Sequence, residues 1–317
     1  MGTDAFFNIV ATALAVFVVT SFGAFLRKKG RLTDQADASL MWLVINVLLP
    51  ALIINSVLRN PALDELENIF VPPLLGFGSV LIGLGLGLLF YNRIGLSEEK
   101  QKRSFLLSNS LNNYGFLPIP LILTLYDRET LGVLFMHNVG VEMAIWTVGI
   151  MIITAKVAIK DRLKRLVNAP LCAVTSCLIL TYSDLDVYIP EFFFRTVHML
   201  GQSAIPLALL LVGSLMYDSV NHFQPRDGFK LIGSSLAIRL LLFPLIYIGL
   251  LWLLPLSLEL KRVMLVQSAQ PAAMLPIVLA KQYDSSPQVA FLVILCTSIG
   301  SMLTMPLWIH FGSQLLP

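Results

Sequence analysis

The chain has 317 residues, of which 56% are hydrophobic and only 13% are charged, and its formal net charge is +3. A soluble domain carries about 25% charged residues, so this composition excludes an ordinary water-soluble protein and predicts one that lies in a lipid bilayer. The small net charge also gives no reason to expect a nucleic acid partner.

The apolar residues fall into segments of the length that a membrane-spanning helix needs, about 20 residues. They predict an all-α integral membrane protein with ten transmembrane helices, at residues 5–26, 39–58, 69–91, 104–126, 130–155, 166–183, 196–217, 231–256, 263–280 and 288–314. Inside these spans the only charged residues are Glu142 and Arg239. The other acidic and basic residues lie in the loops or near helix ends.

The first span is followed by positive charge, from Arg27 to Arg31, whereas a signal peptide carries its positive charge before the apolar stretch. We therefore expect an uncleaved anchor. Most Lys and Arg residues lie in the odd-numbered loops, and the even-numbered loops hold only Arg59, Arg128, Arg195, Lys261 and Arg262. Because positively charged short loops stay in the cytoplasm, we expect a multi-pass protein of the cell membrane with both termini outside.

The two halves of the chain share features that indicate a duplication. Spans two and seven each contain a central proline, Pro50 and Pro206. Spans four and nine both contain Leu-Pro-Ile, at Pro118 and Pro276, and both run on to a Tyr-Asp pair, at Tyr126 and Tyr283. Five spans per half is an odd number, so the second copy would insert upside down. We predict two inverted five-helix repeats, residues 1–158 and 159–317.

Spans four and nine combine a polar run with prolines in mid-membrane. Residues 108–115 precede Pro118 and Pro120, and residues 267–270 precede Pro271 and Pro276. Proline removes a backbone donor and disfavours helix before it, and lipid satisfies no freed backbone group. Two broken helices at equivalent places in inverted halves indicate a transporter site. The alternative is a pair of proline-kinked packing helices whose asparagines are bonded internally.

The breaks also predict the charge of a ligand. The second part of each broken helix begins near the bilayer centre, where its unpaired N–H groups and the positive end of its dipole favour an anion. Uncharged amides suit a carboxylate without the cost of a buried charge. The candidate substrate-binding residues are Asn109, Asn112, Asn113, Tyr114, Gly115, Gln267 and Gln270. Each amide has the alternative role of satisfying the broken backbone, and Tyr114 that of helix packing.

Glu142 lies near the middle of span five, where an acidic side chain is costly and tends to face a cavity, a partner or a proton path. It is a candidate for proton coupling, and His137, a little more than one turn away, is a candidate for extending a relay. The alternatives are a neutral, hydrogen-bonded glutamate, a partner for Arg239, and a histidine satisfied within the core. Arg239 itself has either a structural role, such as snorkelling to the cytoplasmic face, or an anion-attracting one.

Other patterns carry less chemistry. The Gly83-x-Gly85-x-Gly87 run lies in an apolar span, so close helix packing or a dimer seam explains it better than a nucleotide loop. Cys172, Cys177 and Cys296 lie inside spans and are expected to be buried apolar residues. We expect no metal, no cofactor and no enzymatic activity.

At these residues the chain resembles the auxin efflux carrier family of membrane transporters, which includes plant auxin exporters and bacterial malate and malonate carriers. The resemblance covers essentially the whole chain. It is carried by short motifs in the right spans and order: Asn113, Gly115, Pro120 and Leu121; Trp146; Gly213; Arg239 and Pro244; Pro271, Pro276, Ala280, Lys281 and Tyr283.

The resemblance implies a ten-helix fold in which helices four and nine cross at proline-broken centres. It implies organic anions as substrates, Asn113 as the residue that binds the carboxylate, an elevator-like motion, and a homodimer in several members. The chain departs from the family at Pro118, where glycine is common, which puts the size of the substrate in doubt. The short loop at 155–166 is similar to that of bacterial members and argues against a plant-type auxin carrier.

These observations predict a secondary carrier of small organic anions, of the carboxylate class, that works by alternating access around the crossover of helices four and nine. The alternative is a membrane receptor or sensor of small organic anions that does not transport them. Its partners would be the anion and the lipid bilayer.

Overall fold

The computed structural model describes residues 3–154, 158–220 and 228–316. Within these ranges the chain forms helices without a strand, and an isolated bridge joins Asn112 to Ala272. Seven helical stretches are long and apolar enough to cross a membrane: Ile9–Lys28, Asp34–Val57, Glu67–Phe90, Arg128–Ile153, Glu191–Tyr217, Phe229–Leu253 and Pro287–Ser313. The expectation of an all-helical, multi-pass membrane protein is therefore confirmed.

Some of these stretches are single helices, and others contain a wider, π-helical turn. The single helices are α1 (Thr3–Lys28), α4 (Glu67–Phe90), α11 (Glu191–Val220) and α16 (Pro287–Ser313). The composite ones are α2 (Asp34–Leu43), η1 (Val44–Leu48) and α3 (Leu49–Val57); α7 (Arg128–Ala144), η3 (Ile145–Gly149) and α8 (Ile150–Ile153); and α12 (Phe229–Ala237), η6 (Ile238–Leu242) and α13 (Phe243–Leu253).

The π-helical turns η1 and η6 each lead into a helix whose second residue is proline, Pro50 or Pro244. Proline offers no N–H and crowds the preceding turn, and a π turn is a common way to absorb such a defect inside a helix. Pro206 and Pro306, by contrast, lie inside unbroken helices.

The three other predicted spans consist of shorter helices. Residues 104–126 contain the end of α5 (Glu99–Ser110) and all of α6 (Pro118–Leu125). Residues 263–280 contain most of α14 (Leu258–Ser268) and of α15 (Leu275–Gln282). The sixth corresponds to α10 (Ala169–Tyr182). The remaining elements are η2 (Pro61–Asp64), η4 (Asp186–Tyr188) and α9 (Ile159–Lys164). The count of ten spans, and the division at residue 158, stay predictions.

The helices pack into two groups. The first group comprises α1, α2–α3, α10 and α11, and the second comprises α4–α8 and α12–α16, with α1–α16, α3–α7 and α1–α6 contacts between them. In the second group α4 and α7 lie backbone against backbone, since a Cβ on Gly140 would come within 1.7 Å of the carbonyl oxygen of Pro73. Such small-residue contacts replace the hydrophobic effect as the source of helix association in lipid.

The Gly83 to Gly87 run contributes to this packing. A Cβ on Gly83 would meet the backbone of Asn109 and Ser110, and one on Gly87 would meet Leu106, so α4 packs closely on α5. Gly85 faces open space. The run therefore serves helix packing, as expected, and the alternative of a dimer seam remains untested.

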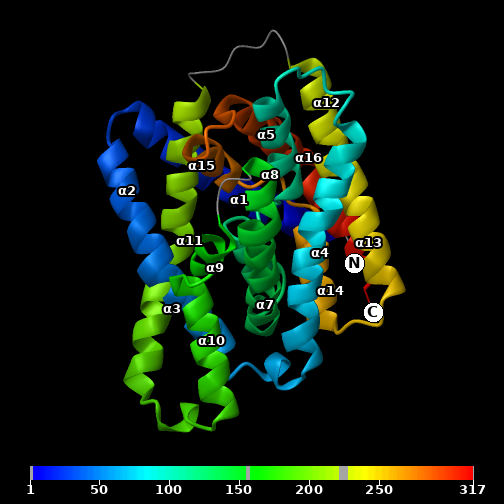
Figure 1. Cartoon of the computed structure of the whole chain (residues 1–317). Coiled ribbons are helices and arrows are strands. Elements are labelled where there is room, and N and C mark those ends of the chain that lie inside the picture. The colour runs from blue at the N-terminus through cyan, green and yellow to red at the C-terminus, as the bar shows by residue number, and fades with distance from the viewer. Residues whose placement is uncertain (1–2, 155–157, 221–227, 317) are drawn as a thin grey trace.

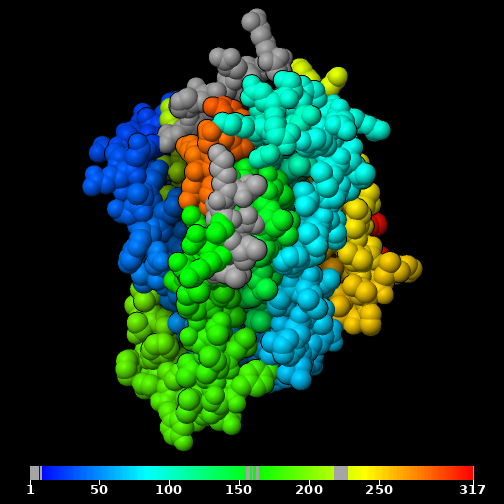
Figure 2. Space-filling model, viewed as in Figure 1, coloured from blue at the N-terminus to red at the C-terminus, as the bar shows by residue number. Residues whose placement is uncertain are grey.

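The two ends of the molecule differ in charge. The turns that follow α1 and α4 lie at the top of Figure 1. The last turn of α1 contains Arg27, and the two turns contain Arg31 and Arg93, so we call this the basic end. The α3–α4 and α10–α11 turns lie at the opposite end. Figure 2 shows the green α9–α10 region on the front surface between the blue and cyan helices.

Candidate functional site

The two broken helices meet in the protein interior. Between α5 and α6, and between α14 and α15, the chain is extended, and the two extended segments pair antiparallel. Asn113 N donates to Pro271 O at 2.8 Å, and Ala273 N donates to Leu111 O at 2.9 Å. This pairing satisfies backbone groups that lipid would leave unpaired.

Prolines set where each broken helix resumes. Pro118 is the first residue of α6 and Pro276 the second residue of α15, both positions where the missing N–H costs nothing because it has no helical partner. Pro120 follows in the first turn of α6, and Pro271 lies in the extended segment itself, where it accepts the bond from Asn113.

Side chains add a second connection between the breaks. Asn112 Nδ2 donates to Gln267 Oε1 at 2.6 Å, and Gln267 Nε2 donates to the carbonyl oxygen of Tyr114 at 3.1 Å and to Asn138 Oδ1 at 3.2 Å. Asn138 Nδ2 donates in turn to Tyr114 O at 2.9 Å. The amide of Gln267 thus uses both its oxygen and its nitrogen within the protein.

Asn109 and Gln270 bond chiefly to their own helices. Asn109 Nδ2 donates to Phe105 O at 2.9 Å and to Ser235 Oγ at 3.3 Å, and Gln270 Nε2 donates to Val266 O at 2.8 Å. The carbonyl oxygens of both side chains are buried and have no partner among the described residues. The side-chain N–H groups of Asn109 and Gln270 are thus used within the protein, which favours a structural role over contact with a ligand.

Asn113 differs from its neighbours. The residue is 7% exposed, and its backbone N–H bonds to Pro271, but no described residue forms a hydrogen bond with its side-chain amide. Beside it, a Cβ on Gly115 would meet no atom within 4 Å, so the break borders open space there. Of the sequence-predicted amides, Asn113 is the one whose side chain remains available to a ligand.

Arg239 bonds to the backbone near the ends of α5 and α14, the two helices that precede the breaks. Its side chain is fully buried; Nη1 donates to Asn109 O at 3.4 Å, Nη2 donates to Gln270 O at 3.2 Å, and the guanidinium lies 4.3 Å from the centre of the Phe243 ring. A cation is favoured at helix C-termini. Arg239 therefore does not snorkel to the basic end, because these carbonyl oxygens already hold it.

Glu142 does not pair with Arg239, which corrects one of the alternatives. Its Oε1 accepts from Tyr114 Oη at 2.7 Å and its Oε2 from Trp146 Nε1 at 2.8 Å. Both carboxylate oxygens are satisfied by neutral donors, and Tyr114 connects Glu142 directly to the first break.

His137 lies away from that network. Its Nε2 is 2.9 Å from Tyr247 Oη, which itself donates to Leu75 O at 3.1 Å, so Nε2 is the donor in this pair. His137 bonds to Tyr247 of α13, whereas Glu142 bonds to Tyr114 in the first break and to Trp146 of η3. Within the described residues, therefore, no hydrogen bond joins them into a relay.

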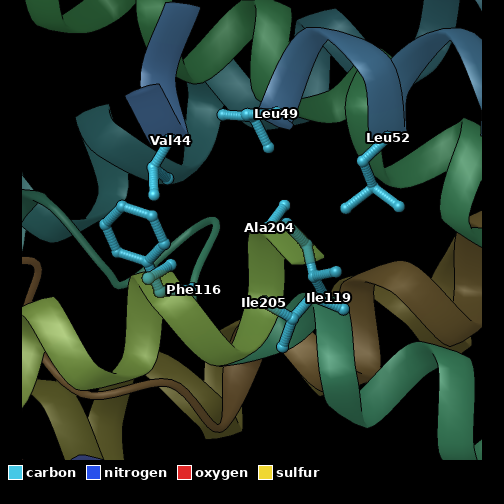
Figure 3. A pocket seen from close by; sticks show the side chains of 8 residues that line it. Val44, Leu49, Leu52, Phe116, Ile119, Ala204 and Ile205 are labelled. Atoms are coloured by element: carbon cyan, nitrogen blue, oxygen red, sulfur yellow. The ribbon is translucent and has the colours of Figure 1, made fainter. Parts of the chain in front are cut away.

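A narrow apolar pocket lies where the first helix group meets the break. It is lined by Val44, Leu49, Leu52, Ala204, Ile205 and Ala208 of the first group and by Phe116 and Ile119 of the second. Figure 3 shows the side chains of Val44, Leu49 and Leu52 on one side of it and Phe116, Ile119 and Ile205 on the other. A second pocket on the same seam lies between Ala13, Val16 and Phe17 of α1 and Leu117, Leu121 and Met305. The seam beside the break is thus apolar.

Sequence reasoning missed several of these features. It did not assign Trp146 to Glu142 or Asn138 to Gln267, although a polar residue inside an apolar span was a usable signal for Asn138. The apolar seam between spans two, four and seven had no sequence signal, because ordinary apolar residues form it.

Metal and thiol chemistry find no support in the part of the chain that the structure describes. No group of three or more His, Cys, Asp or Glu residues is placed there to hold a metal ion. The three cysteines are free: Cys177 is buried, Cys296 is half-buried, and Cys172 is exposed, unlike the buried position expected for it.

The chain is similar in sequence to known membrane transport proteins. A family described as "Membrane transport protein" matches residues 8–159 and 150–309. An uncharacterized transporter of Methanocaldococcus jannaschii is 25% identical over 300 residues, covering 93% of this chain and 96% of that protein. An uncharacterized transporter of Methanothermobacter thermautotrophicus is 25% identical over 305 residues, covering 96% and 98%.

Proposed function

The chain belongs to the auxin efflux carrier family of membrane transport proteins, and from that premise we propose that it is a secondary carrier of small organic anions of the carboxylate class. The observation that carries the substrate class is the pair of broken helices, in which Asn113 keeps an unused amide beside the open space at Gly115. An amide N–H donates to a carboxylate without itself needing a buried counter-charge.

The electrostatics of the half-helices support an anion. The C-terminal ends of α5 and α14, which carry partial negative charge, are served by the guanidinium of Arg239. The N-terminal ends of α6 and α15, which carry partial positive charge, begin at the break and are left for a ligand of opposite sign.

The apolar seam supports a carrier that moves as two bodies. Contacts across the two pockets are non-directional, so the groups can slide without breaking hydrogen bonds there. Directional contacts lie at the opposite end, where Asn60 Nδ2 donates to Glu129 O at 3.2 Å and Arg128 Nη2 donates to Leu58 O at 3.0 Å. Alternating access would release these bonds while the second group carries the break past α3 and α11.

The proposal includes a finer architecture. It has ten transmembrane helices in two inverted repeats, with α5–α6 and α14–α15 as the crossover helices, in the cell membrane, with the basic end in the cytoplasm and both termini outside. Positive-inside placement supports the orientation. The homodimer implied by the family resemblance belongs to the same proposal.

Proton coupling is part of the proposal through Glu142. Tyr114 joins this carboxyl to the break. The charge of Glu142, set by its proton, and an anion at Asn113 would therefore interact electrostatically over a short distance from which water is partly excluded. His137 bonds to Tyr247 instead and has no part in this step.

The test is transport by the purified full chain in proteoliposomes. Malonate, malate, short monocarboxylates and indole acetate are applied at two pH values, with currents recorded on a solid-supported membrane and isotope uptake measured in parallel. Saturable uptake or current for one class is the expected result. Silence in both assays for every anion would overturn the carrier proposal and favour the sensor alternative.

A further inference from the structure

A basic segment lies beside the crossover, outside the site described above. It runs from α9 to α10, through Lys164 and Arg165, and α9 packs against η3, the middle part of the helix that carries Glu142. Figure 1 shows α9 partway between the two ends of the molecule rather than at the basic end. The positive charge of this segment therefore lies at the depth of the middle of the neighbouring helices and not at the basic end.

Arg165 is fixed there by aromatic rings. Its guanidinium lies 5.5 Å from the centre of the Trp146 ring and 5.8 Å from that of Tyr283. A cation–π contact uses the face of the guanidinium and leaves its N–H edge to hydrogen-bond acceptors, here the neutral side chain of Gln282, which a carboxylate could replace in a forked geometry. The rings thus orient the group without using its donors.

Within the described residues Arg165 has no acidic partner. Its hydrogen-bond partner is the neutral side chain of Gln282, and the nearby Asp161 pairs with Lys164 at 3.6 Å. The side chain of Arg165 is half-buried, so water screens its charge less than on an open surface. A half-buried cation without a counter-ion attracts an anion.

Tyr283 supplies an independent indication. Its hydroxyl is buried and has no hydrogen-bond partner in the described structure. A buried polar group without a partner is unusual and costs free energy, which an incoming acceptor would relieve. Two donors that lack an anionic acceptor, Arg165 and Tyr283, therefore lie side by side.

Side chains connect this place to the crossover. Trp146, under Arg165, donates to Glu142, and Glu142 accepts from Tyr114 in the first break. We propose that Arg165 and Tyr283, stacked with Trp146, form a second anion-binding position that takes a small carboxylate on its way between the basic end and Asn113. The direction of that path rests on the proposed function, whereas anion binding at Arg165 does not.

The first test uses iodide, an anion that quenches tryptophan fluorescence on contact, and the full chain in detergent. A parent with Trp42, Trp252 and Trp308 replaced by Phe reports on Trp146 alone. Arg165→Gln should lower iodide quenching about fivefold at low salt, the local enrichment expected of one unit charge about 4 Å away in water. Quenching by neutral acrylamide should stay unchanged. Lys164→Gln, the neighbouring charge, is the matched control and should quench as the parent does.

The second test uses malonate as the carboxylate probe. Malonate should suppress iodide quenching in the parent and in Lys164→Gln but not in Arg165→Gln. Tyr283→Phe should weaken the effect of malonate while leaving iodide quenching in place, because iodide does not need the hydroxyl donor. Thermal melting of each variant shows that the fold is kept, and a variant that melts early is replaced by Arg165→Lys, which should fall between parent and Gln.

Equal iodide quenching in Arg165→Gln and Lys164→Gln would overturn the second position, and an unchanged malonate effect in Tyr283→Phe would remove the hydroxyl from it. These outcomes are separate from the failure of the carrier proposal. If the quenching pattern holds but no anion is transported, the binding position stands and the carrier fails. If an anion is transported but Arg165→Gln and Lys164→Gln quench equally, the carrier proposal stands and the second binding position fails.

Discussion

The break between α5 and α6 pairs with the break between α14 and α15, but the two use their polar side chains differently. In the first, Asn113 keeps its amide unbonded within the described residues, and Tyr114 reaches Glu142. In the second, Gln267 is bonded to Asn112, Tyr114 and Asn138, and Gln270 to its own helix. In the proposed carrier, one break presents a ligand contact and the other supports it.

This difference follows from the chemistry of a buried broken helix. Freed backbone donors and acceptors need partners, and two breaks that pair can supply them for each other with one set of side chains. The other set is then released for a ligand. Arg239 bonds to both breaks at once, at a backbone carbonyl in the last turn of α5 and at one just beyond the end of α14.

The largest effect is expected from Arg239→Met, which keeps the volume but removes the donors. It leaves the backbone carbonyl oxygens of Asn109 and Gln270 without this partner, and the free energy of unfolding should fall by about 2–4 kcal/mol. Thermal unfolding in detergent measures it. Arg195→Met, at an exposed site, is the control and should be neutral. If the Arg239→Met variant proved as stable as the parent, the guanidinium would not be what holds the breaks.

Gln267→Ala tests the support between the breaks. It removes the acceptor for Asn112 and the donor to Tyr114 O and Asn138, and we expect a loss of about 2 kcal/mol. Gln202→Ala, an exposed glutamine, serves as the matched change in the same unfolding experiment. An equal, small effect of the two substitutions would argue against the second break as a support.

Glu142→Gln tests the link from the first break to a proton. A pH gradient of one unit drives at most about tenfold accumulation for one proton per anion. The parent should accumulate substrate in response to the gradient, and the variant should only equilibrate it. Glu129→Gln, in the first turn of the same helix, should behave as the parent. Accumulation retained by the Glu142→Gln variant would end the proton-carrier assignment.

The smallest effect is expected at Asp127, at the opposite end, outside the spans. Burial raises its pKa, but hydrogen bonds from Thr130 and the charge of Arg262 outweigh burial and bring the pKa below the usual 3.8. A lowered folded pKa stabilises the protein above about pH 3.8, and this contribution is lost as the pH falls through the folded pKa. Asp127→Asn should lower the free energy of unfolding slightly at pH 7, by under about 1 kcal/mol for so exposed a pair. The difference should shrink as the pH falls below about 3.8 and disappear below the folded pKa, and a difference that does not change with pH would contradict the assignment.

Much of the fold was predictable because its signals are local. Hydropathy placed the long helices within a few residues of their observed ends, and the chemistry of Pro118 and Pro276 placed the points where broken helices resume. The all-helical membrane class and the family followed from the same residues.

The assignment of individual polar residues was less predictable, because it depends on contacts between distant segments. Asn109, Asn112 and Asn113 look alike in sequence, and only their partners distinguish them: Ser235 and Phe105 for the first, Gln267 for the second, and none described for the third. The sequence also left Arg239 and Glu142 as a plausible pair, whereas the fold gives each its own neutral partners.

The most direct test of the central claim is uptake by Asn113→Ala of whichever anion the parent transports. Loss of a hydrogen bond to a charged ligand should reduce uptake at low substrate concentration by at least about tenfold. The melting midpoint should stay that of the parent, because no described bond within the protein is lost. Uptake by the Asn113→Ala variant equal to that of the parent would contradict the claim that the first break binds the substrate.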